Sequence, residues 1–180
     1  MGLALAVCAG QALAMTPFET LTRACVDTHG DRAKALAVAD QAGWMAMPQA
    51  LVDKLPKSEF EEPQGRLFST PSSMLMLIVA RAHPPFASGV AVAVCALTAI
   101  PADPMFDKLA ADLAGIPKDD NIGKNAVYYA WREEDGRHQP IKHVTADDPQ
   151  LVAEGAFVLM EETNEKMSMV LLVVGNATPH

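Results

Sequence analysis

The sequence is poor in aromatic residues, in basic residues and in cysteine. Only 6% of its 180 residues are Phe, Trp or Tyr, and 14 Lys and Arg stand against 22 Asp and Glu, which gives a net charge of −8. Nonspecific binding to nucleic acid and docking on anionic lipid both need basic patches, so this acidity disfavours them. We therefore expect no nucleic-acid partner.

The motifs of several enzyme classes are also missing. The chain has no Gly-x-Ser-x-Gly elbow, no glycine-rich phosphate loop and no His-Glu-x-x-His zinc motif. We expect no cofactor and no metal, and the sequence assigns no catalytic residue. Half of the residues are hydrophobic, and a chain of this length suffices for one domain with an aliphatic core.

The N-terminal segment has the pattern of a secretory signal. A short apolar run at 3–9 precedes the small-x-small sequence Ala12-Leu13-Ala14, which predicts cleavage after Ala14. No Lys or Arg precedes the run, which leaves the true start of the signal open. A buried N-terminal helix is the alternative interpretation.

These features predict a division of the chain and a location. We expect a signal peptide at 1–14, a single domain at 15–175 and a frayed tail at 176–180. No later stretch is long enough to form a transmembrane helix. The mature protein is therefore expected to be periplasmic or secreted, without stable membrane insertion.

Two cysteines remain beyond the predicted cleavage site. Cys25 falls on an apolar stripe with Phe18 and Leu21, and Cys95 lies in an apolar, strand-like run. An even pair suits an oxidising compartment, so we expect a Cys25–Cys95 disulfide with Cα atoms within about 7 Å. The alternatives are a nucleophile formed by Cys25 and His29, or a zinc site formed by these three residues.

The order of elements predicts an α+β fold. Capping signals and helical spacing predict a helix pair over 16–43, and a further helix begins at Asp103-Pro104. Between Trp44 and Pro63 the chain is rich in proline, and we expect a long surface connection. Six strand-like runs are joined by hairpin signals. The runs are 74–82, 90–99, 125–132, 138–144, 157–161 and 166–174. Hairpins of this kind predict one antiparallel sheet of about five to six strands with the three helices packed on it.

Tyr129 and Trp131 are the best candidates for a binding site. They lie two residues apart on a predicted strand and so point to the same side of the sheet. An exposed face would make them a binding surface, because Tyr and Trp are enriched at interfaces. A face covered by a helix would place both in the core.

Methionines and carboxylates form weaker candidates. Three Met-x-Met pairs could offer thioethers to Cu(I), although methionine also fills aliphatic cores. The pairs are Met45/Met47, Met74/Met76 and Met167/Met169. Two clusters of acidic residues fall at predicted hairpin ends, where their carboxylates are expected to keep the turns solvated. These groups are Glu133/Glu134/Asp135 and Glu161/Glu162/Glu165.

The sequence therefore favours an exported binding or interaction module. Its partner is expected to be another exported protein or a small ligand. A small hydrolase without a recognisable motif is the first alternative, and a copper-handling or other metal-handling protein is the second.

Overall fold

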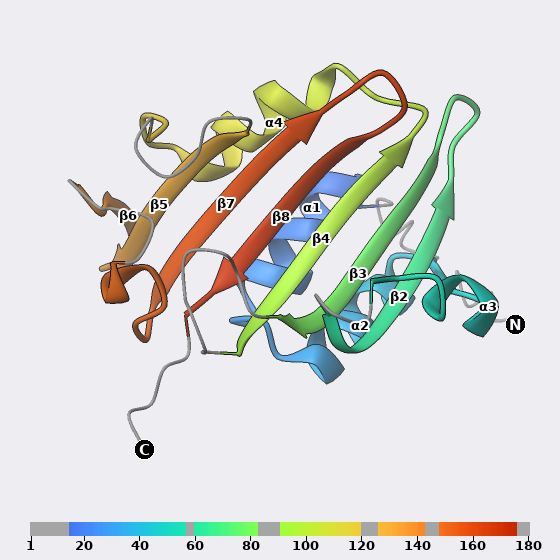
Figure 1. The fold of residues 1–180 in the computed structure, drawn as a ribbon, viewed down its shortest axis with the longest axis horizontal. Coiled ribbons are helices and arrows are strands. Elements are labelled where there is room, and N and C mark those ends of the chain that lie inside the picture. The colour runs from blue at the N-terminus through green and yellow to red at the C-terminus, as the bar shows by residue number, and fades with distance from the viewer. Residues whose placement is uncertain (1–14, 57–59, 83–90, 120–125, 143–147, 176–180) are drawn as a thin grey trace, which may run out of the picture.

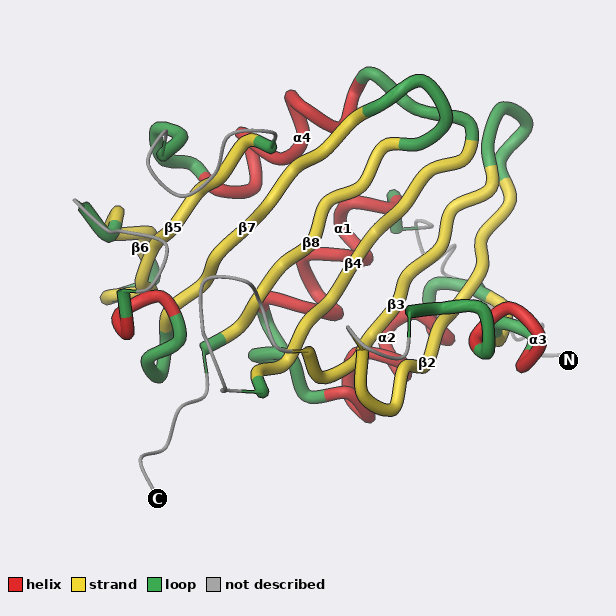
Figure 2. The backbone as a smooth tube through the Cα atoms, viewed as in Figure 1, coloured by secondary structure: helices red, strands yellow, loops and turns green. Residues whose placement is uncertain are grey.

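One antiparallel sheet runs through the centre of the fold (Figure 1, Figure 2). The computed structural model describes residues 15–56, 60–82, 91–119, 126–142 and 148–175. Within them the sheet has eight strands in the order β1-β2-β3-β4-β8-β7-β5-β6. The strands are β1 Met45–Ala46, β2 Phe60–Ser69, β3 Met74–Ala82, β4 Val92–Ile100, β5 Val127–Glu134, β6 Arg137–Pro140, β7 Ala156–Thr163 and β8 Ser168–Val174. The predicted α+β class and antiparallel sheet are confirmed.

The predicted number of five to six strands is wrong, because β1 and β2 were missed. Strand β2 pairs with β3 over its whole length, but it contains Pro63 and Gly65, which break the usual strand pattern. The register shifts between Glu61 and Gln64, so a bulge removes the proline from the regular ladder. Inside the bulge, Glu62 takes a left-handed φ of 48°.

The helices lie mainly on one side of the sheet, behind it in Figure 1. They are α1 Pro17–Leu21, a π-helical segment η1 Thr22–Val26, α2 Arg32–Gln41 and α4 Met105–Ala114. The arrangement differs from the predicted one, because the first helix changes from α to π geometry after Leu21. The largest hydrophobic cluster fills this helix-covered side, with Leu21, Trp131 and Phe157 buried in it.

The turn that joins η1 to α2 packs tightly on the sheet. Gly30 has a φ of +70°, and a Cβ atom there would lie 2.7 Å from the Cβ of Ala93 on β4. Only glycine satisfies both the left-handed backbone and this close approach. The turn therefore anchors the helical layer to the middle of the sheet.

The opposite side of the sheet is covered only at its two ends by described elements. A short helix, α3 Gln49–Val52, lies at one of these ends, and Leu51 and Val52 pack over Ile78 and Ala96. At the other end the 3-10 turn η2, Pro149–Leu151, places Leu151 against a cluster that includes Val158.

Several predictions fall outside the described residues. They concern the signal at 1–14, the start of the strand-like run 90–99, the end of the run 138–144 and the tail at 176–180. Among the helices that the structure does describe, none is long and apolar enough to cross a membrane.

Candidate functional site

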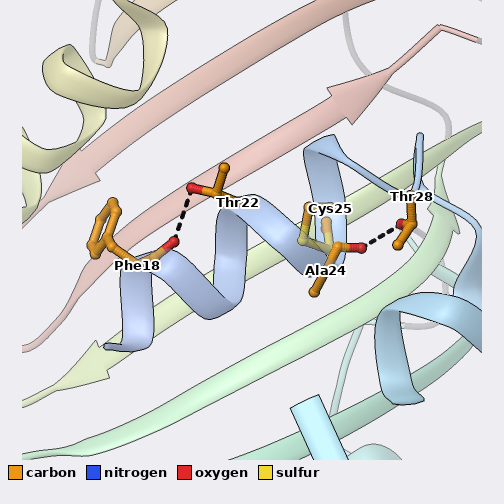
Figure 3. Close-up of a disulfide and its surroundings, with 6 residues drawn as sticks. Phe18, Thr22, Ala24, Cys25 and Thr28 are labelled. Carbon is orange, nitrogen blue, oxygen red and sulfur yellow. Dashed lines mark hydrogen bonds between the residues drawn. A yellow bond between two sulfur atoms is a disulfide. The ribbon is translucent and has the colours of Figure 1, made fainter. Parts of the chain in front are cut away.

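The predicted disulfide between Cys25 and Cys95 is present (Figure 3). It joins η1 to β4, with a Cα–Cα distance of 5.8 Å, and both residues are fully buried. Bonded sulfur provides neither a thiolate nucleophile nor a zinc ligand, so both alternatives for Cys25 are wrong in this structure. His29 is exposed, and its ring lies 5.8 Å from the ring of Phe157.

The helix that carries Cys25 has unusual geometry at this point. It begins with a capping box, in which Thr16 and Glu19 satisfy each other's backbone N–H groups. From Thr22 onward it widens to a π-helix, closed by a bond from the Asp27 N–H to the Thr22 carbonyl at 3.1 Å. Threonine hydroxyls bond back to helix carbonyls on both sides of the wide turn, as the pair Thr22 and Phe18 shows in Figure 3. Single π-turns are rare and occur frequently at functional sites.

Helix α4 lies beside this π-turn on the same side of the sheet. Phe106 on α4 meets the ring of Phe18 on α1 edge to face, with ring centres 5.4 Å apart. The helix ends at Gly115, whose φ of 62° gives the left-handed cap that glycine favours. The aromatic contact fixes the two helices relative to each other.

A groove separates these two helical segments. Its volume is about 680 Å³, within the range of small-molecule sites. The apolar residues that line it are Phe18, Val26, Leu109 and Leu113. The charged residues that line it are Glu19, Arg23, Asp27, Asp112 and Glu133, so carboxylates outnumber the single cation by four to one. We call this site the helix groove.

His138 on β6 lines one part of the helix groove. Its Nδ1 lies 2.7 Å from the carbonyl oxygen of Ala114, at the end of α4. A carbonyl can only accept, so Nδ1 donates this hydrogen bond. The histidine thus ties β6 to α4.

An aromatic stack continues from His138 into the core. The ring of Trp131 stacks on His138 with centres 4.8 Å apart, and Phe157 stacks on Trp131 at 5.4 Å. The indole Nε1 of Trp131 is buried and has no hydrogen-bond partner among the described residues. A buried donor without a partner costs about 1–3 kcal/mol, so its presence needs an explanation.

The structure places the predicted binding residues on the helix-covered side. Trp131 is fully buried and Tyr129 is 7% exposed, so both belong to the core. Burial and the charges of Glu161 and Asp107 raise the pKa of the Tyr129 hydroxyl. Neither residue forms an exposed surface. Trp131 is connected to the helix groove through His138, a link that the spacing of two residues on one strand could not reveal.

Glu161 differs from the other hairpin carboxylates. Its five predicted companions are exposed, whereas Glu161 is only 4% exposed. The Thr163 hydroxyl donates to its Oε1 at 2.7 Å. Burial raises the pKa of the carboxyl, and a hydrogen bond with Asp107 raises it further. Ser168, which lies beside Thr163, is fully buried, so a substrate has no access to its hydroxyl in this arrangement.

The described residues do not group into a metal site. Nowhere in these parts of the chain do three or more His, Cys, Asp or Glu side chains gather around a common point. Of the methionine pairs, Met45 is exposed while Met47 is buried under α3. Met76 and Met169 both pair with Thr98, one strand on each side of β4, so a whole strand separates them.

Comparisons with protein-family models, with curated proteins and with solved structures gave no match for this chain.

Proposed function

We propose that this chain is an exported binding module, and that the helix groove binds a small molecule with an apolar body and a positively charged group. The observation that carries the proposal is the composition of the groove: an apolar surface surrounded by four carboxylates and one arginine. Apolar contact supplies most of the affinity in such sites, and the few charged groups select the ligand.

Two features of the surrounding structure support this site. The π-turn supplies Thr22, Arg23 and Val26 to the groove wall, and π-turns recur at functional sites. Beneath the groove, the aromatic stack contains Trp131, whose buried indole N–H is unpaired among the described residues. Both features cost stability that a purely structural element would not need to give up.

Export is supported by the disulfide, which is a bond that persists in oxidising compartments. The N-terminal pattern ending in Ala12-Leu13-Ala14 supports it independently. The two arguments use different residues and predict the same location.

A matched pair of probes tests the charge preference. The cation 2-naphthylmethylamine and the anion 2-naphthoate share one apolar body and differ in the sign of their charge. Calorimetric titration should show binding of the cation and much weaker binding of the anion. Equal binding of both probes, or of neither, would contradict the proposal.

A pair of neighbouring variants tests the location. Glu133 lines the groove, whereas Glu134, its exposed neighbour on β5, does not. Glu133→Gln should weaken binding of the cation by about threefold to tenfold, as expected for one partly solvated charge contact. Glu134→Gln should leave the affinity unchanged. An equal loss of affinity in both variants would show that binding depends only on the overall charge of the protein and not on the helix groove.

A further inference from the structure

A second, separate pocket lies at the outer edge of the sheet. Its volume is about 480 Å³, and it is formed by the bulge of β2, the start of α2 and the helix α3. The residues that line it are Arg32, Met47, Gln49, Val52, Glu62, Pro63, Gln64, Gly65 and Arg66. Two guanidinium groups and two side-chain amides therefore face one cavity in a protein whose net charge is −8.

Arg66 is firmly held in this pocket. Its Nε and Nη2 donate to the two carboxylate oxygens of Asp40 at 2.6 and 2.9 Å, and its Nη1 donates to the Gly65 carbonyl. The hydrogen bonds to Asp40 raise the pKa of the Arg66 guanidinium and lower that of the Asp40 carboxyl. Arg66 is thus a fixed positive charge in the pocket wall.

Arg32 is held less completely. Its Nη1 alone makes both of its contacts to described residues, at 2.8 Å to a carboxylate oxygen of Glu62 and at 3.1 Å to the Glu62 carbonyl. The Nε and Nη2 groups have no hydrogen-bond partner among the described residues. A guanidinium presents five N–H donors in a rigid fork. The Nε and Nη2 side of Arg32 therefore keeps donors that a second carboxylate can use.

The Glu62 carboxylate holds the position on Arg32 that a ligand carboxylate could take. Its side chain is 73% exposed, so its ion pair with Arg32 is weak and easily opened. Its backbone is in the left-handed region at the centre of a β-bulge, and bulges of this kind are common next to binding and active sites.

We infer that this pocket, which we call the bulge pocket, binds a small free carboxylic acid. The ligand's carboxylate takes the place of the Glu62 side chain on Arg32. Arg66, held by its ion pair with Asp40, forms part of the pocket wall, and Gln49 and Gln64 offer amide groups to the polar remainder of the ligand. The polar lining with two arginines does not suit the apolar cation assigned to the helix groove, and the two sites share no residue, so they are expected to bind independently.

Arginine NMR signals test this inference directly. The intact mature protein is titrated with succinate, with neutral succinamide and with inorganic phosphate, while the Nε–H signals of Arg32 and Arg66 are followed. Succinate should shift both signals in a saturable way, and succinamide should not. Similar responses to phosphate and succinate would indicate a nonspecific cationic surface and would overturn the inference.

Three variants locate the effect. Glu62→Gln removes the competing charge and should tighten succinate binding severalfold. Arg32→Met should weaken it by about tenfold, as expected for loss of a charge-assisted hydrogen bond. Arg137→Met, an exposed arginine on β6, is the matched control and should change nothing. Weaker binding in Glu62→Gln, or unchanged binding in Arg32→Met with its fold intact by circular dichroism, would contradict the inference.

Discussion

At the scale of single residues, Glu161 has the clearest energetic signature. Burial raises its pKa, so the folded chain keeps this proton to higher pH than the unfolded chain does. Between the ordinary and the raised pKa the folded state binds more protons, and the free energy of unfolding contributed by this group therefore falls as pH rises. Glu161→Gln cannot ionise. In urea titrations at several pH values, the free energy of unfolding of this variant should fall less with rising pH than that of the parent protein. Above the raised pKa of Glu161, the variant should be the more stable of the two.

Glu165 provides the control for this prediction. It is exposed between β7 and β8 and is not among the groups that shift the pKa of Glu161, so Glu165→Gln should leave the pH dependence as it is in the parent protein. If Glu161→Gln had the same pH dependence as the parent protein, Glu161 would not be a titrating group in this range.

At the scale of elements, the disulfide ties the helical layer covalently to the sheet. It closes a loop with a sequence separation of 70, for which the chain-entropy model gives about 4 kcal/mol. The double variant Cys25→Ala/Cys95→Ala should lose about that much of its free energy of unfolding in urea. The parent protein in reducing buffer serves as the control and should lose a similar amount. Free thiols in the unreduced, denatured protein would contradict the bond itself.

The elements also show what the sequence could and could not predict. The predicted strand 74–82 has the observed bounds of β3, and Asp135-Gly136, between the predicted strands 125–132 and 138–144, forms a hairpin turn with positive φ at both residues. Strand β2 was missed because its proline and glycine lie in and beside a bulge, which local patterns read as the end of a strand.

The candidate sites depended on contacts between distant segments. The π-turn is missed because one inserted residue leaves the apolar stripe around Cys25 intact. Both sites join segments far apart in sequence, such as Arg23 with Leu109 and Arg32 with Arg66. No local pattern encodes those contacts. The burial of Glu161, in contrast, could be predicted from local sequence. Residues two apart in a strand point to the same side, so Glu161 lies on the same side of β7 as Phe157 and Leu159.

At the scale of the whole molecule, the two sites differ in the charged residues that line them. The helix groove is lined by four carboxylates and one arginine, and the bulge pocket is lined by two arginines and one glutamate. An acidic protein with this distribution should separate its ligands by charge, with the apolar cation in the groove and the small acid at the bulge. Because the sites use different elements, ligand binding at one should not compete with the other.

A chemical-shift map of the labelled protein, titrated with 2-naphthylmethylamine, tests the central claim most directly. The account predicts that the largest backbone shifts fall on both walls of the helix groove, at 22–27 and 109–113, together with His138. The amides of the bulge pocket at 62–66 should not move. Shifts confined to the bulge pocket or to the opposite side of the sheet, or no saturable shifts at all, would contradict the assignment of the helix groove as the binding site.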